Sequence, residues 1–473
     1  MNPGFDLVLR NAHVVTASDE MDCDIGVSGG RIVALGRDLP AGTREIDAAG
    51  RVVTPGGVDA HCHLDQPMPP PARMADDFDT GTRSAACGGT TTVIPFAAQV
   101  KGQSLRAAVD DYHQRADGRA HTDYAFHLIV SDPTPEVLQV ELPALIREGY
   151  SSFKIYMTYD DLKLDDGQIL DVLDVAREHG AMAMIHAENA DCIEWLTRRL
   201  EAAGRTAPRF HAQARPMLVE REATHRAIAL SELVDVPILI VHVSGREAVE
   251  QIRWARAHGL KVFAETCPQY LFLTAEDLGI DDSYLGARCV CSPPPRDKRN
   301  QQVIWDGLAD GLFTVFSSDH APFRFDAPEG KKPGGQEVAF RHIPNGIPGI
   351  ETRLALLYSE GVLGGRITAN RFVELTATNP AKAYGLHPRK GTIAIGSDAD
   401  LVVWDERDFT LTNQQLHHAV DYTPYAGMAL RAWPGLTLCR GEVLWQDGQF
   451  LGRGGHGRFL PCGAPTLLPR KRA

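Results

Sequence analysis

Between residues 53 and 320 the chain alternates short β-rich runs with longer helical patterns. Such alternation is typical of βα units around a parallel sheet, because the long crossover between parallel strands is usually a helix. Eight β-rich runs occur: VVTPGGVDAHCH, TTTVIPF, YAFHLIV, SSFKIYM, AMAMIH, PILIVHV, LKVFAE and FTVFSSD. Eight parallel strands predict an α/β fold of the (β/α)8 TIM-barrel type.

Two of the intervening stretches carry helix boundary signals. The segment DDFDTGTRSAACGG has Asp as a candidate N-cap and a Gly pair at its end. The segment QILDVLDVAREHG spaces its apolar residues at helical intervals. Both are therefore predicted to be helices packed on the sheet.

The two ends of the chain have a different pattern. Residues 1–55 contain short strands separated by turn signals, and the same pattern returns after residue 390 in GTIAIGSDADLVVWDE and LTLCRGEVLWQDGQF. We therefore predict that 1–55 and 389–473 pair into a small β-sandwich and that 56–388 form the barrel. The start, MNPGFDLVLRNAHVV, is expected to be a strand and not a signal peptide, and the end PRKRA to be a short solvated tail.

Composition excludes several classes of function. With 23% charged and 44% apolar residues, and no apolar run near the roughly 20 residues of a membrane span, the chain is expected to be globular and without a membrane segment. The net charge of -13 argues against nucleic acid or an anionic membrane as a partner. Nine scattered Cys without a CxxC motif fit a reducing compartment, so the expected location is the cytoplasm.

His61 and His63 close the first β-rich run and suggest a metal site. With 18 His in 473 residues, however, an HxH pattern is expected about once by chance, so the pair alone is a weak motif. Cys62 between them would point to the opposite face of a strand, and we interpret it as a packing residue.

Other candidate ligands fall at the same end of other predicted strands. In a TIM barrel the active site lies at the C-terminal ends of the strands, so residues that close a strand carry most weight. Taken singly, a His on a strand is more often a hydrogen-bonded core residue than a metal ligand. Likewise, an Asp beside Ser residues is more often a helix cap. Jointly, four His and one Asp predict a metal centre: His61, His63, His186, His242 and Asp319. Another of the predicted strands carries Lys154.

Lys154, flanked by Phe153 and Ile155, would be costly to desolvate as an ammonium ion inside a barrel. Reaction with carbon dioxide would convert it to a carbamate that bridges two divalent ions. Alternatively, the side chain extends to solvent at the end of the strand. The residues themselves leave both options open.

Taken together, the motifs resemble those of the cyclic amidohydrolases, within which the dihydropyrimidinase and D-hydantoinase type is most similar. The resemblance runs through nearly the whole chain, in TPGGVDAHCHLD, GGTTTVIPF, SSFKIYMTY, IHAEN, VHVSG, AETCPQYLFL, SPPPR, SSDHAPF, NGIPGIE and GTIAIGSDADLVVWD. It implies a barrel with a small β-sandwich, a binuclear zinc centre and a homotetramer.

The resemblance also implies roles for individual residues. His61, His63 and Asp319 would bind one zinc ion and His186 and His242 the other, with carboxylated Lys154 and a hydroxide bridging them. Tyr159 would steady the oxyanion, and the main chains of Ser292 and Asn345 would hold the imide edge of the ring. Imidazole and oxygen donors without thiolate suit zinc, although cobalt or manganese also bind such sites.

The chemistry implied is hydrolysis of a small cyclic amide, a 5,6-dihydropyrimidine or 5-substituted hydantoin, to the N-carbamoyl amino acid. The hydroxide would attack the ring carbonyl while Asp319 transfers a proton to the leaving nitrogen. Allantoinase and cyclic imide hydrolase remain alternatives, whereas dihydroorotase is disfavoured because Asp65 stands where that family has Arg. A non-catalytic dihydropyrimidinase-like scaffold is a distant alternative, since all six candidate ligands are present.

Two segments are expected to shape the substrate site. The stretch DQPMPPPARMADD, with Gln66 in place of a Met-like residue, is predicted to line the side-chain pocket. The Gly-, Pro- and Lys-rich stretch from Pro322 to Pro344 is a second candidate lid.

Overall fold

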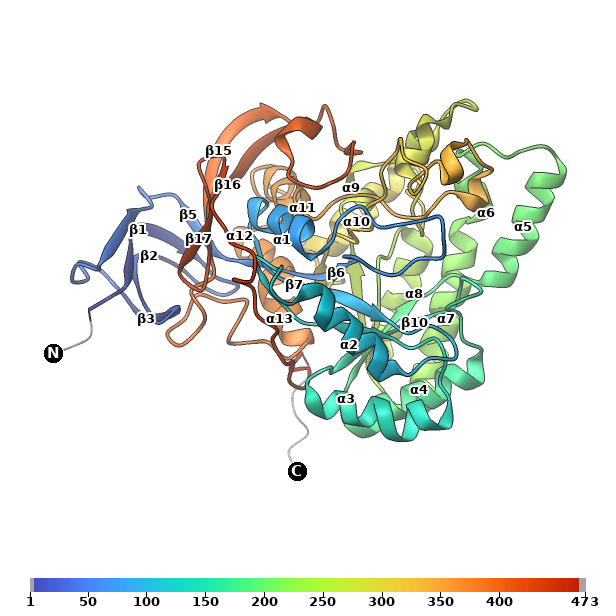
Figure 1. Ribbon diagram of the computed structural model, residues 1–473, viewed down its shortest axis with the longest axis horizontal. Coiled ribbons are helices and arrows are strands. Elements are labelled where there is room, and N and C mark those ends of the chain that lie inside the picture. Colours follow the sequence, from blue (N-terminus) through green and yellow to red (C-terminus); the bar gives the residue numbers. More distant parts are fainter. Residues whose placement is uncertain (1–3, 468–473) are drawn as a thin grey trace.

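The eight predicted runs each contain a strand, and these strands pair into a parallel barrel (Figure 1). The computed structural model describes residues 4–467, so the end PRKRA lies outside the described residues. In barrel order the strands are β6 (Gly57–Cys62), β7 (Thr90–Ala98), β9 (His127–Ile129), β10 (Ser152–Tyr156), β11 (Met182–His186), β12 (Ile238–Ile240), β13 (Val262–Thr266) and β14 (Val315–Phe316). The short β8 (Asp123–Tyr124) pairs beside β7.

The barrel closes between its last strand and its first, just beyond the end of β14. The backbone N–H of Asp319 donates to the carbonyl of His61 at 2.9 Å, and that of His63 donates to the carbonyl of His320 at 2.7 Å. Below them, Oδ1 of the buried Asp59 accepts the N–H of Ser318 at 3.1 Å. Closure therefore brings the segment that carries Asp319 against the end of β6.

Helices cover the outside of the barrel. They are α1 (Phe78–Cys87), α2 (Leu105–Ala116), α3 (Leu142–Glu148), α4 (Asp166–His179), α5 (Ala190–Ala202), α6 (Phe210–Ala214), α7 (Met217–Val234), α8 (Arg246–Ala257), α9 (Gln269–Phe272), α10 (Lys298–Ala309), α11 (Arg353–Leu357), α12 (Ala369–Val373) and α13 (Asn379–Ala383). Both predicted helices are confirmed. Asp77 caps α1 in a capping box, and α4 ends at Gly180, whose φ of 67° suits glycine.

Alternation along each strand decides which side chains face the barrel interior. On β10, Phe153 and Ile155 pack in the large core that includes residues of the surrounding helices, so Lys154 between them faces inward. On β6, Cys62 belongs to the same outer core, which agrees with its predicted packing role, and His61 faces inward. Because successive side chains of a strand point to opposite faces, His61 and Lys154 point into the barrel.

Strands from both ends of the chain pair with one another, as predicted, and form one further sheet. Its order is β18 (Gln449–Phe450), β17 (Glu442–Gln446), β16 (Ala429–Cys439), β15 (Leu401–Thr410), β5 (Val52–Pro55), β1 (Leu7–Val15), β2 (Glu20–Ser28) and β3 (Arg31–Gly36), with β4 (Arg44–Asp47) beside β1. The N-terminal and C-terminal segments meet where β5 pairs antiparallel with β15, for example at Val53 and Val403. This β-rich domain has its own apolar core and lies to one side of the barrel. The proposed limits at residues 55 and 388 stay predictions.

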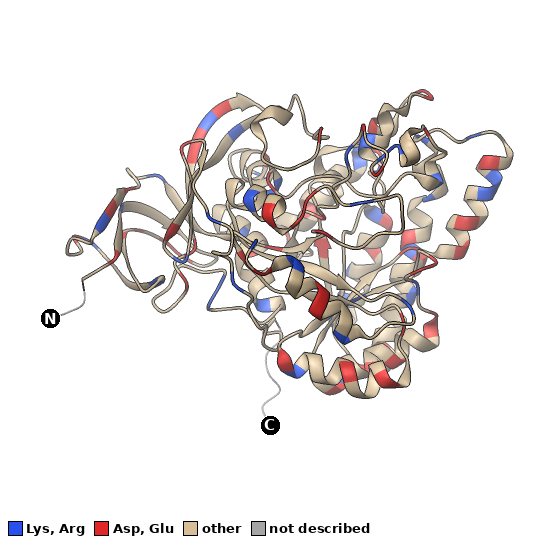
Figure 2. Ribbon diagram, in the orientation of Figure 1, with Lys and Arg blue, Asp and Glu red and all other residues tan. Residues whose placement is uncertain are grey.

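Charges are distributed over the outer surface, where acidic and basic side chains lie close together on helices such as α3 and α4 (Figure 2). Within residues 4–467, no helix is both long and apolar enough to cross a membrane. All nine Cys are free thiols, and eight of them are buried.

Candidate active site

The six predicted metal ligands converge at one end of the barrel, although they come from five strands. His61 lies on β6, Lys154 on β10, and His186 is the last residue of β11. His242 and Asp319 lie two and three residues beyond the ends of β12 and β14, so they follow these strands instead of closing them. All six side chains are buried.

The two residues beyond their strands have a left-handed backbone. The φ angle is 38° at His242 and 48° at Asp319, in a region that non-glycine residues seldom adopt. Strained backbone of this kind is concentrated at functional sites. It also explains why strand periodicity alone does not fix where these two side chains point.

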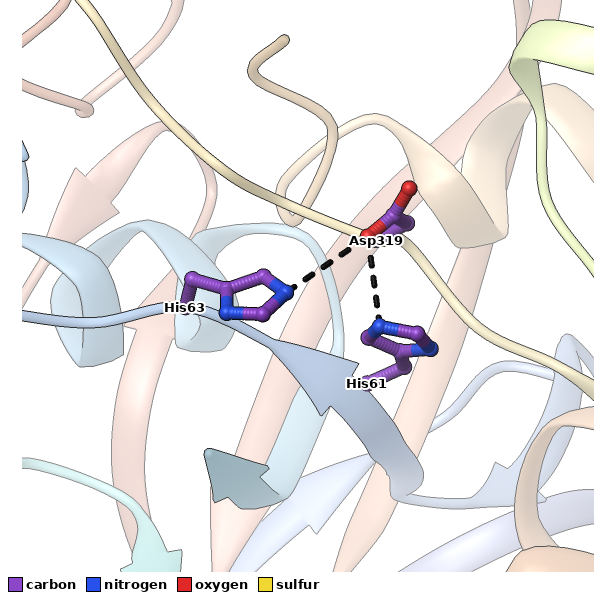
Figure 3. A group of neighbouring side chains, drawn as sticks. All are labelled: His61, His63 and Asp319. Atoms are coloured by element: carbon purple, nitrogen blue, oxygen red, sulfur yellow. Dashed lines mark ion pairs between the residues drawn. The ribbon is translucent and has the colours of Figure 1, made fainter. Parts of the chain in front are cut away.

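One cluster consists of His61, His63 and Asp319 (Figure 3). Oδ1 of Asp319 lies 3.3 Å from Nε2 of His61 and 3.7 Å from Nε2 of His63. Both imidazoles point toward this carboxylate from the end of β6. Two imidazole nitrogens and a carboxylate oxygen at this spacing form a candidate site for a divalent ion.

A second cluster lies beside the first. Nε2 of His242 is 2.9 Å from Nδ1 of His186, and the ring of His242 lies 5.4 Å from that of His61. Nζ of Lys154 is 2.8 Å from Nε2 of His61 and lies over the rings of Phe96 and Tyr156. Lys154 therefore points into the candidate metal-binding cluster formed by these residues and does not extend to solvent.

Burial sets the charge states of these groups. Burial lowers the pKa of His61, His186 and His242, so their imidazoles are neutral, which is the form that binds metals. Burial also lowers the pKa of Lys154. Burial would raise the pKa of Asp319, but the neighbouring His61 and His63 outweigh it and hold this pKa below its usual value.

Two carboxylates that sequence reasoning missed lie behind the imidazoles. Glu265 Oε1 is 2.6 Å from Nδ1 of His61, and Glu188 Oε2 is 2.8 Å from Nε2 of His186. Arg215 donates to the same Glu188 oxygen at 2.9 Å. Carboxylates placed in this way fix the tautomer and orientation of a metal-binding His. Their position at or just beyond a strand end, in LKVFAE and IHAEN, was the available signal.

Tyr159, Ser292 and Asn345 line the same cavity as the clusters. The ring of Tyr159 lies 5.4 Å from that of His186 and 5.5 Å from the guanidinium of Arg215. Burial raises the pKa of Tyr159 to about 12, so its hydroxyl remains a proton donor at neutral pH. The side-chain oxygen of Asn345 is buried without a hydrogen-bond partner among residues 4–467.

The cavity has a volume of about 840 Å³, which is enough for a small ring with a substituent. Both predicted loops contribute to its wall: Gln66, Pro67, Met68, Pro69, Ala72 and Met74 from one and Arg341, His342, Ile343 and Pro344 from the other. Gln66 has an additional contact, since its Oε1 is 2.6 Å from Nδ1 of His63. It therefore supports a candidate ligand as well as lining the pocket.

The chain is similar to known proteins over nearly its whole length. A model of the amidohydrolase family matches residues 52–444. The D-hydantoinase of Ralstonia pickettii is 44% identical over 457 residues, which cover 96% of this chain and 98% of that protein. The D-hydantoinase of Geobacillus stearothermophilus is 45% identical over 463 residues, 96% of each chain. The crystal structure of a dihydropyrimidinase from Brevibacillus agri NCHU1002 superposes with a TM-score of 0.93 at 43% identity, covering 97% of this chain and 98% of the other.

Proposed function

Because the chain belongs to the amidohydrolase family and is a cyclic-amide hydrolase, we propose that it opens 5,6-dihydropyrimidines and 5-substituted hydantoins to N-carbamoyl amino acids at a binuclear zinc centre. The names of its relatives support this substrate class. The observation that carries the proposal is the convergence of four imidazoles, Lys154 and Asp319 in one buried cluster.

The ligand set fits two divalent ions. We assign His61, His63 and Asp319 to one ion and His186 and His242 to the other, because the nitrogen and oxygen atoms of each set face one another. The nitrogen on the far side of His61, His63 and His186 is bound to Glu265, Gln66 and Glu188, respectively. The remaining nitrogens of these imidazoles point into the two clusters, where they would bind the ions, and a set of imidazoles with a carboxylate suits zinc.

Lys154 would contribute as its N-carboxylate. In this reaction the lone pair of the neutral amine forms a bond to the carbon of CO2, one C=O electron pair moves to oxygen, and Nζ releases a proton. Burial favours the neutral amine that the reaction needs. The product would place an anion where Nζ of Lys154 now contacts Nε2 of His61.

The protein's own groups would carry out the rest of the reaction. When bound, the ions supply a hydroxide nucleophile at neutral pH and Lewis acidity at the ring carbonyl. Asp319 would accept the proton of the nucleophile and deliver it to the departing ring nitrogen. The Tyr159 hydroxyl would donate to the developing oxyanion, and the main chains of Ser292 and Asn345 would hold the imide edge.

A substrate panel tests the proposal. Zinc-loaded protein would be assayed with dihydrouracil, hydantoin, 5-substituted hydantoins, allantoin and small cyclic imides. We expect ring opening of the first three classes at rates well above the last two. Opening of allantoin alone, or of cyclic imides alone, would replace the proposed substrate class by that alternative.

We also propose a homotetramer in the cytoplasm. The assembly rests on the family resemblance, and the compartment rests on nine free thiols, which fit a reducing environment. Light scattering after size exclusion would measure the mass of the assembly, and fractionation of cells that produce the protein would locate it. A monomer, or recovery outside the cytoplasm, would contradict these two assignments.

A further inference from the structure

Lys331 is a fully buried lysine outside the metal-binding cluster, with 0% of its surface exposed. Its Nζ donates to the carbonyl of Val290 at 2.9 Å and to that of Pro344 at 2.6 Å. Within residues 4–467 it forms no ion pair with a carboxylate. Burying an ammonium group without a carboxylate partner is costly. The two hydrogen bonds from Lys331 to backbone carbonyls therefore indicate a specific role for this side chain.

The two carbonyls belong to the segments that would hold the substrate. Val290 lies two residues before Ser292, and Pro344 immediately precedes Asn345. The two segments also pair directly, since the N–H of Gly346 donates to the carbonyl of Val290 at 3.0 Å. Lys331 therefore joins the two backbone segments that carry Ser292 and Asn345. The relative position of these segments sets the spacing of the two residues.

The backbone of Lys331 is also fixed by hydrogen bonds. Its N–H donates to the carbonyl of Arg324 at 2.8 Å, and the hydroxyl of Tyr284 donates to the carbonyl of Lys331 at 2.5 Å. At Gly330 a Cβ atom would lie 1.9 Å from the carbonyl oxygen of Arg324, so only glycine allows this close approach. The base of the loop from Pro322 to Pro344 is thus a rigid support for the Lys331 side chain.

We propose that Lys331 is a positioning residue that clamps the Val290–Ser292 and Pro344–Gly346 segments at the spacing needed to bind the imide edge of a cyclic amide. The inference rests on the proposed function, in which these segments bind that edge. Lys331 does not line the cavity, so it acts through the backbone and not by touching the substrate. Burial lowers its pKa to about 7, and even a neutral amine has two N–H groups for the two carbonyls.

The clamp predicts a particular kinetic signature. Lys331→Met removes the donors while keeping an apolar chain of similar length. We expect KM to rise at least about tenfold, equivalent to about 1.4 kcal/mol of binding, for hydantoin and for 5-benzylhydantoin alike, because both rings share the imide edge. Bound zinc should stay at the wild-type content and kcat should change less than about threefold, since the metal-binding cluster is not touched.

Two further variants complete the test. Lys332→Met is the matched control, because Lys332 is the next residue, is partly exposed, forms an ion pair with Asp326 at 2.9 Å and lies over the ring of Phe325. Its KM should stay within about twofold of wild type. Lys331→Gln keeps an N–H donor group on a shorter side chain, which reaches the two carbonyls less well, and should give an intermediate KM. If Lys331→Met does not fold, the KM of Lys331→Gln tests the clamp instead.

The outcomes separate the clamp from the proposed function. If the wild type opens both hydantoins but a folded Lys331 variant retains the wild-type KM, the clamp is overturned while the proposed function stands. A KM rise confined to 5-benzylhydantoin would likewise overturn it, because it would place Lys331 at the substituent pocket. If the wild type opens no cyclic amide at all, the proposed function fails and the role of the clamp fails with it.

Discussion

Oε1 of Glu265 lies 2.6 Å from Nδ1 of His61 and links the end of β13 to the end of β6 across the barrel mouth. The same oxygen accepts the backbone N–H of His242 at 3.0 Å. Glu265 is fully buried and so holds one candidate ligand from each metal site in place. A carboxylate in this position also raises the basicity of the imidazole that it contacts.

Glu265→Gln should therefore weaken zinc binding while leaving the ligands themselves intact. We expect the affinity for zinc to fall about 10- to 100-fold, as is usual when the outer partner of a metal-binding His is changed. Competition with a fluorescent chelator would measure it. Glu250→Gln on the exposed face of α8 is the control, and equal affinities for the two variants would remove Glu265 from this role.

Lys154→Ala should lose both bound metal and activity, because the proposed bridge between the ions is removed. Elemental analysis and the ring-opening assay would measure the two losses. Short-chain carboxylic acids such as acetate should restore part of the activity by replacing the carbamate. Lys163→Ala, which changes a partly exposed residue beyond the same strand, should behave as wild type. Full activity in Lys154→Ala would eliminate the bridge.

Tyr159→Phe should lower turnover and leave the metal content unchanged. Loss of one donor to a developing oxyanion usually lowers kcat by about 10²- to 10³-fold. Steady-state kinetics with parallel zinc analysis would detect this, and Tyr150→Phe, which removes a hydroxyl that contacts His113, is the control. Turnover equal to wild type would deny Tyr159 the role of oxyanion donor.

The stability of the protein should depend on pH through Lys331. Burial lowers its pKa from 10.5 to about 7, so between about pH 7 and pH 10.5 the unfolded chain binds more protons at this site than the folded chain. The contribution of Lys331 to stability should therefore rise with pH across this window, and its penalty should be fully present below about pH 7. Urea unfolding at pH 6.5, 8 and 9.5 should show wild type gaining stability relative to Lys331→Met as the pH rises. A constant difference would contradict this assignment.

Lys390 provides a stability test at the junction of the two domains. Its Nζ contacts Asp123 of the barrel at 2.6 Å and Asp400, just before β15, at 2.7 Å, and all three groups are buried. Lys390→Met should lower the free energy of unfolding by about 3–5 kcal/mol, because it leaves buried carboxylates without this cation. Urea denaturation would measure the loss. Lys261→Met, which removes a partly exposed ion pair, should cost at most about 1 kcal/mol.

Much of the fold was predictable because its signals are local. Each of the eight β-rich runs contains a strand, and strand periodicity correctly separates inward His61 from outward Cys62. The rule that barrel sites lie at the C-terminal strand ends brought six residues of the cluster together without knowledge of any contact. The positions of His242 and Asp319 were less accurate, because both follow their strands in left-handed backbone that periodicity does not describe.

The supporting residues were not predictable in the same way. Glu265 meets His61 across 204 positions of sequence, and Lys331 meets Val290 across 41. Gln66 was expected only in the pocket wall, yet it also contacts His63. Which carboxylate stands behind which imidazole depends on strand order and on the path of the loops, and neither is encoded in the spacing of residues along one segment.

The amino-acid sequence by itself determined the alternating strands and helices, the inward direction of His61, and the chemical types that meet at the barrel mouth. Backbone periodicity and side-chain chemistry are properties of short segments, so they can be deduced from the sequence. Only the tertiary structure decided that Glu265 and Glu188 orient the imidazoles and that Lys331 joins two loops. These contacts depend on atoms from distant segments coming within hydrogen-bonding distance, which happens only after the barrel closes.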